Sequence, residues 1–514
     1  MRKRAYPTPL GNQRGVALIT VLLVMLVMAI LVTGVIVIAV SNYNQSKKTD
    51  EHSQAYYVAE AGVNFEVKSF ETKISELVAA GNSPIAILNG IDTWITATGT
   101  SQQTLSSVNG HARTFAAEMT RNSYAINITS TGTVGSVSRT LHKRIRLNGL
   151  LINKAILTSG ILNINKTDVF LDPTGGYGEV QTLLNAAGSV NIDKLGQISE
   201  ISIPTPIPPM TFVDVIQGCT AVGPLSDQTC QTGAYTYKVV YDDSITTLPP
   251  VTIPTQPSVS KTTDLLLPVQ ITGKSKALVS STGVLSISSN SVNAGYAYTL
   301  AASNDPKVNF YTPKFEIIGT ISNFAIDIGD KDIVIVTDEL DLGGSFKIQG
   351  TGTLTVFVTS NNFHYTCGNS SICGVQGNVT PTVSDQFIVV ITGTTGATLD
   401  LSNNTGNFYM SLITNLNVNL SMQGNGTFNG FLATSGSSIS FKGTAASNML
   451  IYAPNATVNI TGNSTVSGSI IAKSYQNLNS ASTSVTYNPA FSNPPFDFLN
   501  PFSNMIYDPT VETQ

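Results

Sequence analysis

The stretch "RGVALITVLLVM" (residues 14–25) begins a long apolar run in the chain. The run covers residues 16–40, which are 25 residues without a charge, and as a helix it would be about 37 Å long, enough to cross a bilayer. Four basic residues precede it, whereas Lys47 and Lys48 on its far side lie beside two carboxylates. The positive-inside rule therefore places the N-terminus in the cytoplasm and predicts export of everything after residue 40.

Two ordinary interpretations compete for this run. A cleavable secretory signal would have an apolar stretch of about 7 to 15 residues that ends at a small-residue cleavage site. The run at 16–40 is too long for that. A plain signal anchor remains open on hydropathy alone.

The residues around the start of the run resemble a known processing site. "NQRGVALITVLLVM" resembles the class III leader junction of type IV pilins and pseudopilins, which implies a leader at 1–15 that a prepilin peptidase removes by cutting between Gly15 and Val16. Most members carry glutamate five residues into the mature chain, where this sequence has Thr20. PilX-type minor pilins and the K-type minor pseudopilin of type II secretion often lack that glutamate, so the resemblance narrows to a PilX-like minor pilin.

Thr20 also has a physical interpretation. A carboxylate inside a bilayer is costly unless it is paired, and in pilins it is thought to pair with the terminal ammonium of a neighbouring subunit. A subunit with Thr20 avoids that cost and gives up the pairing, which suits an initiating or terminal position in a filament. In a plain anchor, Thr20 would simply be a neutral membrane residue.

The helix is expected to continue to residue 80. Apolar residues between 63 and 77 recur at spacings of three and four, and "AAGNSP" at 79–84 supplies a stop. "AYYVAEAGVNFEV" (55–67) also resembles a segment common in PilX-type proteins. Alternating apolar residues around the turn "STGTVGS" then predict a small antiparallel sheet within 81–147. A long helix followed by such a sheet is the α+β arrangement of pilins.

The C-terminal half contains a repeat. Seven segments align on one position, with spacings of 22, 33, 22, 20, 20 and 19 residues, at Thr337, Thr359, Thr392, Thr414, Thr434, Pro454 and Lys473. A period near 20 with short alternating strands predicts an all-β parallel β-solenoid over 311–488. An antiparallel sandwich is the alternative.

The remaining segments are assigned around this repeat. "ILTSGILNINKTDVFL" predicts a first solenoid rung within 148–172, and 173–310 reads as an irregular Pro-rich insertion. The tail at 489–514, rich in Pro and Phe, is expected to cap the last rung, because an uncovered solenoid end exposes unpaired strand edges.

The four cysteines form two local pairs on an exported chain, Cys219 with Cys230 and Cys367 with Cys373. Each pair encloses turn-forming residues, so two loop-closing disulfides are the preferred interpretation. Free thiols remain an alternative. Zinc is disfavoured, since neither pair has a C-x2-C spacing and the four histidines are scattered.

Composition excludes several functions. Charged residues make up 11% of the chain and the net charge is -4, so there is no basic field for nucleic acid. Residues 408–480 contain only Lys442 and Lys473 as charged residues, which leaves no carboxylate pair for glycan chemistry there. The acidic segment 327–341 is read as a solvated edge, with calcium left open. We expect neither catalysis nor a cofactor.

The sequence thus predicts a minor pilin-like structural protein, in or priming a type IV pilus or related filament, with a solenoid head for surface contact or adhesion. By resemblance, its partners would be the prepilin peptidase, other pilins and the inner-membrane assembly platform, besides a possible surface or glycan ligand. It would cross the cytoplasmic membrane once before assembly and reach the pilus or cell surface afterwards. A membrane-anchored adhesin outside any filament, and a polysaccharide-acting β-helix enzyme, are the alternatives. Pilus and type II secretion pseudopilus are not distinguished, nor are the envelope type, the ligand and the copy number.

Overall fold

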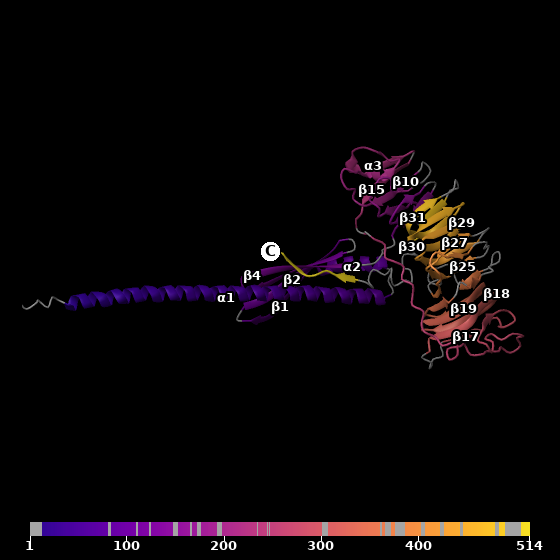
Figure 1. Ribbon diagram of the computed structural model, residues 1–514, viewed down its shortest axis with the longest axis horizontal. Coiled ribbons are helices and arrows are strands. Elements are labelled where there is room, and N and C mark those ends of the chain that lie inside the picture. Colours follow the sequence, from indigo (N-terminus) through magenta and orange to yellow (C-terminus); the bar gives the residue numbers. More distant parts are fainter. Residues whose placement is uncertain are drawn as a thin grey trace, which may run out of the picture. The chain divides into compact units, whose positions relative to one another are not determined.

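The chain forms two compact units (Figure 1). Unit 1 combines Met1–Ala80, Asn89–Arg146 and Ile506–Gln514, and unit 2 combines Gly81–Leu88 with Leu147–Met505. The computed structural model describes residues 13–80, 84–108, 111–122, 125–147, 153–164, 167–171, 176–192, 198–233, 235–243, 245, 247–300, 307–359, 362–364, 372–375, 386–401, 407–421, 426–442, 446–477, 483–488 and 505–513.

The N-terminal helix α1 (Gln13–Ala79) is 67 residues long and continuous. It ends where the "AAGNSP" stop was expected, and it begins three residues before Val16. A second helix, α2 (Pro84–Thr98), follows and is absent from the sequence prediction. Ser83 before Pro84 is a start signal for it, because proline is favoured at the first position of a helix.

The small antiparallel sheet expected at 81–147 is present. Its first strands are β1 (Thr100–Val108), β2 (His111–Asn122), β3 (Ala125–Val134) and β4 (Val137–Leu147), each paired with the next. Figure 1 shows them beside the C-terminal half of α1. Along most of β3, buried and half-buried residues alternate, because successive side chains of a strand point to opposite faces of the sheet.

The C-terminal end of the chain joins the same sheet. The strands β33 (Met505–Tyr507) and β34 (Val511–Thr513) both pair with β4. Arg139 on β4 forms an ion pair of 2.8 Å with Glu512, and the Tyr507 hydroxyl donates to Glu71 Oε1 at 2.9 Å. Residues 505–513 therefore close an edge of the unit 1 sheet, which differs from the expected solenoid cap. The rest of that expected cap, 489–504, lies outside the described residues.

Unit 2 is built from parallel strands that pair with strands about 20 residues further along the chain. Thus β26 pairs with β28, β28 with β30 and β30 with β31, all in parallel. This pairing excludes the antiparallel sandwich for these strands. The strands from 309 onward are β18 (Asn309–Gly329), β19 (Ile333–Gly350), β20 (Leu354–Val358), β21 (Phe363–His364), β22 (Ile372–Val375), β23 (Phe387–Ile391), β24 (Thr398–Asp400), β25 (Asn407–Tyr409), β26 (Ser411–Thr414), β27 (Asn417–Ser421), β28 (Thr427–Thr434), β29 (Ser438–Lys442), β30 (Ala446–Thr461), β31 (Thr465–Asn477) and β32 (Thr483–Tyr487).

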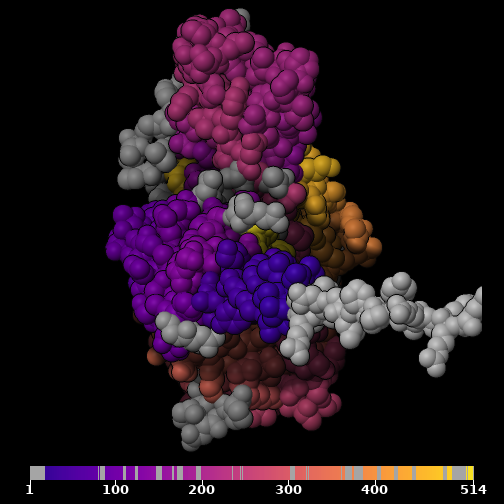
Figure 2. Space-filling view, turned by 90° about the vertical axis from the view of Figure 1, so that its left-hand side faces the viewer, coloured from indigo at the N-terminus to yellow at the C-terminus, as the bar shows by residue number. Residues whose placement is uncertain are grey.

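Each turn of the chain through this stack is called a coil below, and the coils do not follow the sequence order. Ile156 pairs with Ile470 and Thr158 with Ala472, so the coil at 156–171 lies against the last coil, at 465–487. The coils that follow it continue outward, because β5 pairs with β9, β9 with β11 and β11 with β15. In Figure 2, the magenta coils accordingly lie at one end of unit 2, beyond the yellow ones.

The segment 173–310 is consequently more regular than expected. It supplies strands at both ends of the stack. Near the magenta end it adds β8 (Gly176–Tyr177), β9 (Glu179–Thr182), β10 (Val190–Asn191), β11 (Glu200–Ile203), β12 (Ile216–Gln217), β13 (Thr220–Ala221), β14 (Thr229–Thr232) and β15 (Tyr235–Tyr241), with the short helices α3 (Phe212–Val215) and η1 (Leu225–Asp227). The preceding coil, which was predicted as the first rung, holds β5 (Ile156–Thr158), β6 (Leu162–Asn163) and β7 (Thr167–Leu171). At the other end, β16 (Leu285–Ile287) and β17 (Ala297–Thr299) pair with β18.

The proline-rich part of this segment runs along the stack between the two ends. The Tyr452 hydroxyl donates to the Pro249 carbonyl in the middle of the stack. Further along, the amide of Leu266 donates to the Tyr311 carbonyl at 3.0 Å. Val251 and Leu266 are buried against the coils. The connector is therefore a strap that spans the coils from β15 to β16.

One buried corner of the coils is rich in threonine. Thr312 pairs with Thr337, Thr414 with Thr434, and Thr158 with Thr182. Their hydroxyls bond the backbone of the turns at this corner: Thr434 Oγ1 accepts from the Gly436 amide in the turn that follows it at 2.9 Å, and donates to the Leu416 carbonyl of the neighbouring coil at 2.6 Å. A buried turn needs such partners, because unsatisfied backbone groups are costly.

The predicted repeat alignment holds at this corner for only some coils. Thr414 and Thr434 are paired residues of neighbouring coils, as the alignment predicts, and so they stack in one column. In other coils the residue in the column comes one position before the residue that the alignment chose. Thr337 pairs with Val358, Ile391 with Thr414, and Ala453 with Ala472. An alignment that matches threonines therefore equates exposed residues, such as Thr359, with threonines that are buried in other coils.

This corner gives a stability prediction. Thr434→Val keeps the shape of the side chain but leaves a buried carbonyl and a buried amide without their partner, so we expect the free energy of unfolding of unit 2 to fall by about 2 kcal/mol. Thr434→Ser keeps the hydroxyl and should cost about 1 kcal/mol. Thermal unfolding of the full chain in detergent, followed by circular dichroism, checks both. A valine variant as stable as the serine variant would contradict the role of the hydroxyl.

Candidate functional site

The first half of α1 is a bare apolar rod. Its large hydrophobic side chains from Leu18 to Val40 are between 46% and 65% exposed, and none of its most apolar window is buried in the structure. This helix is the one element among the described residues that is long and apolar enough to cross a membrane. So much exposed apolar surface requires a lipid or protein environment.

The predicted processing junction lies at the start of this rod. Gly15 and Val16 are within α1, but their side chains lie outside the described residues. Thr20 is exposed one turn further on and makes an interaction of its own. The predicted junction thus directly precedes the exposed apolar surface that begins at Leu18.

The second half of α1 packs on the sheet of unit 1. Ala55, Val58 and Val63 are buried, and Ala55 and Val58 form a cluster with Phe115 and other residues of the sheet. Of the predicted apolar stripe, Val63, Phe70 and Ile74 are buried, whereas Val67 and Leu77 are half-buried.

Two glycines permit this close approach of helix and sheet. A Cβ atom at Gly132 of β3 would lie 2.3 Å from the Ala55 carbonyl oxygen and 2.3 Å from the Ala59 nitrogen. A Cβ at Gly62 of α1 would lie 2.2 Å from Ser130 Oγ. Gly132 therefore lets the β3 backbone pass directly over Ala55 and Ala59, whereas Gly62 leaves room for the Ser130 side chain.

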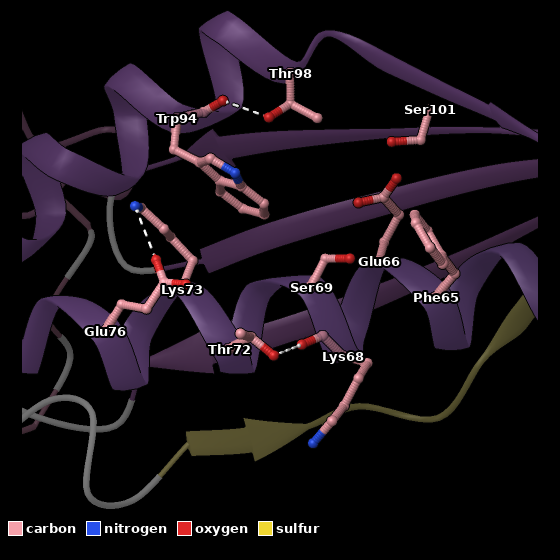
Figure 3. A pocket seen from close by; sticks show the side chains of 10 residues that line it. All are labelled: Phe65, Glu66, Lys68, Ser69, Thr72, Lys73, Glu76, Trp94, Thr98 and Ser101. Atoms are coloured by element: carbon pink, nitrogen blue, oxygen red, sulfur yellow. Dashed lines mark hydrogen bonds and ion pairs between the residues drawn. The ribbon is translucent and has the colours of Figure 1, made fainter.

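A groove of about 460 Å³ opens beside this packed half of α1 (Figure 3). Glu66 is 2% exposed and its carboxylate is hydrogen-bonded to Ser101. Trp94, the single tryptophan of the chain, lies on the opposite wall. On the rim, Lys73 pairs with Glu76 at 3.1 Å. The groove offers an indole and several hydroxyls for contact, and two of its charged residues, Lys73 and Glu76, pair with each other.

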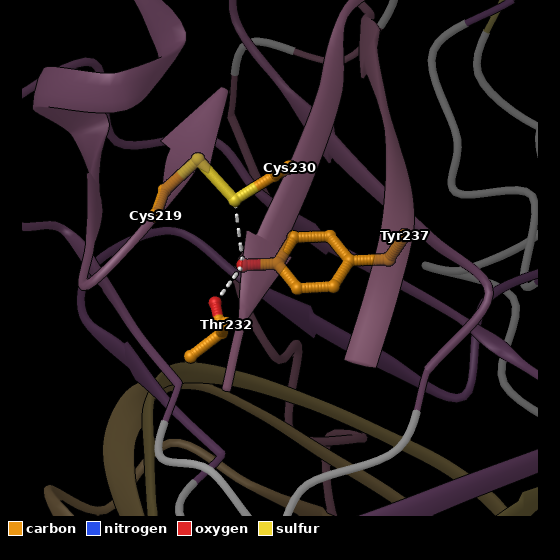
Figure 4. Close-up of a disulfide and its surroundings, with 4 residues drawn as sticks. All are labelled: Cys219, Cys230, Thr232 and Tyr237. Carbon is orange, nitrogen blue, oxygen red and sulfur yellow. Dashed lines mark hydrogen bonds between the residues drawn. A yellow bond between two sulfur atoms is a disulfide. The ribbon is translucent and has the colours of Figure 1, made fainter. Parts of the chain in front are cut away.

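The disulfide between Cys219 and Cys230 lies near the β15 end of the unit 2 stack. Figure 4 shows it beside Tyr237 and Thr232. Cys230 is on β14, which pairs antiparallel with the terminal strand β15. The Tyr237 hydroxyl lies 2.9 Å from Cys230 Sγ and 2.7 Å from Thr232 Oγ1, and burial raises the pKa of Tyr237 to about 12. The cross-link therefore fastens the hairpin that covers an open end of the parallel stack.

The second predicted pair is described only in part. Cys373 is buried on β22 and is disulfide-bonded, whereas Cys367 lies outside the described residues.

The acidic segment 327–341 is used in contacts between coils. Asp338 accepts hydrogen bonds from Lys261 at 2.8 Å and Thr359 at 2.8 Å, and from the Tyr311 hydroxyl. Partial burial opposes ionisation, but these bonds hold the pKa of Asp338 below its usual value. Because Lys261 belongs to the strap, this carboxylate fastens the strap to the coils. Within the described parts of the chain, no group of three metal-ligating side chains is assembled.

Sequence reasoning missed the C-terminal strand pair and the true order of the coils. The signal for β34 is weak, since "VET" is only three residues long. The order of the coils depends on pairing between segments about 300 residues apart, for which a single sequence gives no periodic signal.

Comparison with known proteins gives limited matches. Residues 405–493 match a domain of unknown function, DUF7305. No curated protein matches the chain. Among solved structures, the competence-associated pilin ComZ from Thermus thermophilus is similar at 11% identity, with a TM-score of 0.27, over 90% of this chain and 98% of that one.

Proposed function

We propose that the chain is a PilX-like minor pilin that enters or primes a type IV pilus or a related filament. The observation that carries the proposal is the division of α1 into two halves. One half is bare and apolar from Leu18 to Val40, and the other is buried on a small antiparallel sheet from Ala55 to Ile74. A plain signal anchor has no need for one continuous helix that serves both purposes.

The junction at Gly15 and Val16 supports the same proposal. Removal of the leader by a prepilin peptidase would leave Val16 at the start of the apolar rod, ready to pack against the helices of other pilins. Before assembly the rod would anchor the chain once in the inner membrane, with unit 2 exported. The membrane assembly platform and other pilins would then be its partners.

Unit 2 is proposed to be a β-solenoid head for surface contact, acting mechanically and without turnover. The repeated parallel pairing near a 20-residue interval supports the solenoid. Asp332 and Asp338 of the acidic segment accept hydrogen bonds from the next coil, which gives little support to a polysaccharide-acting enzyme.

A low copy number follows from the size of the head and from Thr20. Pilin helices need close lateral contact, and unit 2 extends from residue 147 to residue 505, which is too bulky to repeat at every position of a tight shaft. A subunit with Thr20 also needs no neighbouring ammonium to neutralise a carboxylate within the membrane. We therefore place the chain at the filament tip or at rare positions.

Immunogold labelling of sheared filaments tests this proposal. The expected result is sparse gold, mostly at filament ends, from an antibody against unit 2. Regular decoration along the shaft, as dense as that of a major pilin, would overturn the low-copy position. Absence from filaments together with retention in membranes would favour the anchored adhesin.

A further inference from the structure

The outer face of unit 2 carries a continuous column of polar side chains, all of them uncharged except the first. Successive strands pair in register so that one outward position stacks through eight strands, from β24 through β27, β29, β30, β31, β6 and β10 to β12. The residues at this position, in order, are Asp400, Asn419, Ser440, Asn459, Gln476, Asn163, Asn191 and Gln217. Its seven intervals of about 4.8 Å give a length of roughly 34 Å.

A second column lies beside the first. Its members are two residues earlier on five of the same strands: Thr398, Asn417, Ser438, Thr457 and Ser474. The residues between the two columns, such as Val418 and Val458, are buried in the core, whereas the column residues are half-buried or exposed. The two columns are therefore about 7 Å apart on one pleated surface. This two-column surface is called the amide face below.

The amide face differs from an ordinary solvated sheet surface, where charged side chains alternate in sign. Its two columns contain one charged residue, Asp400, which stands at the end and accepts from Asn419 Nδ2 at 2.9 Å. Lys442 flanks the face in the next outward position on β29. A surface that is polar but uncharged over seven successive strands implies a requirement other than solubility.

The chemistry of the face restricts its ligand. An anionic polymer such as DNA would require several basic residues. A protein partner would require an apolar centre with aromatic or aliphatic anchors, and neither column contains one. Side-chain amides and hydroxyls each donate and accept hydrogen bonds, which matches the hydroxyl groups of sugars.

We propose that the amide face binds an extended, neutral polysaccharide that lies along the columns. In such a polymer hydroxyl groups recur at an interval close to the spacing of neighbouring strands, so that one rigid row of side chains can meet one row of sugars. Single hydrogen bonds exchanged with water contribute little, and binding therefore depends on many aligned contacts. This inference deepens the proposed surface-contact function by naming its ligand class.

Co-sedimentation of the detergent-solubilised full chain with cellulose and with chitin tests the inference. The test variant combines Asn419→Ala, Asn459→Ala and Gln476→Ala on the amide face. The matched control combines Thr465→Ala, Ser467→Ala and Thr486→Ala, which are half-buried positions on strands β31 and β32 of the same stack. Circular dichroism verifies that both variants fold.

We expect the native chain to sediment with at least one of the two polysaccharides. The test variant should lose about tenfold or more in affinity because three aligned hydrogen-bonding groups are removed, and the control should change by less than about twofold. Binding to neither polysaccharide, or equal binding by native and test proteins, would overturn the proposal. Preferential binding to double-stranded DNA or alginate would also overturn it. So would dimerisation of the native chain that is lost in the test variant. None of these results depends on cleavage at Gly15, so a failure here is distinguishable from a failure of the pilin assignment.

Discussion

A Gly132→Ala variant is expected to lose the packing of α1 on its sheet. The added methyl group would lie 2.3 Å from backbone atoms of both Ala55 and Ala59, and backbone cannot rotate away as a flexible side chain can. Helix and sheet must therefore separate locally, which uncovers the cluster around Ala55, Val58 and Phe115. We expect a destabilisation of unit 1 of more than about 3 kcal/mol.

Limited proteolysis of the detergent-solubilised chain measures this effect, through the rate of cleavage between residues 41 and 147. Gly34→Ala is the matched control, because a Cβ atom there meets nothing within 4 Å and alanine favours the helix. Equal protease resistance of the Gly132→Ala and native chains would show that the helix does not pack as closely as described.

A Gly15→Glu variant is expected to accumulate at full length in the membrane. The resemblance at residues 12–25 implies that the peptidase cuts after Gly15, where a long charged side chain would replace a hydrogen atom. Since the apolar rod is unchanged, insertion should proceed while maturation stops. Immunoblots of membrane fractions from cells with the native peptidase would show the uncleaved precursor.

Gly11→Glu is the control for this variant, since it adds the same charge to the expected leader away from the junction. It should be processed like the native chain. If Gly15→Glu matured normally, the junction would not be a peptidase site, and the anchored adhesin would become the better description.

Local patterns predicted the elements well. The uncharged run at 16–40, the stripe from Val63 to Leu77 and the stop after Ala79 identified one long helix, because each is a property of neighbouring residues. The alternation on both sides of "STGTVGS" likewise identified the hairpin of β3 and β4.

Non-local pairing limited the rest. The threonine alignment found the period of the coils but slipped by one residue in several of them, because Thr337 and Thr434 bond turn backbone from a buried corner whereas Thr359 is exposed beside its turn. The return of residues 505–513 to β4 and the contact of residues 156–158 with residues 470–472 join distant parts of the chain. Such contacts depend on which strand edges remain unpaired in the folded protein.

The amide face had a partial sequence signal. "NVN" at 417–419, "SIS" at 438–440 and "TVN" at 457–459 each place a buried apolar residue between two polar ones. The continuation of the column through Asn163, Asn191 and Gln217 had no such signal. These residues come early in the sequence, but their coils stack on the coil that is last in the sequence.

We propose that α1 is a pilin helix freed from its leader. Intact-mass and N-terminal peptide analysis of the native chain, extracted from membranes or sheared filaments, tests it most directly. We expect a mature chain that starts at Val16 and lacks residues 1–15. A chain that retains Arg14 and Gly15 in both fractions would contradict it.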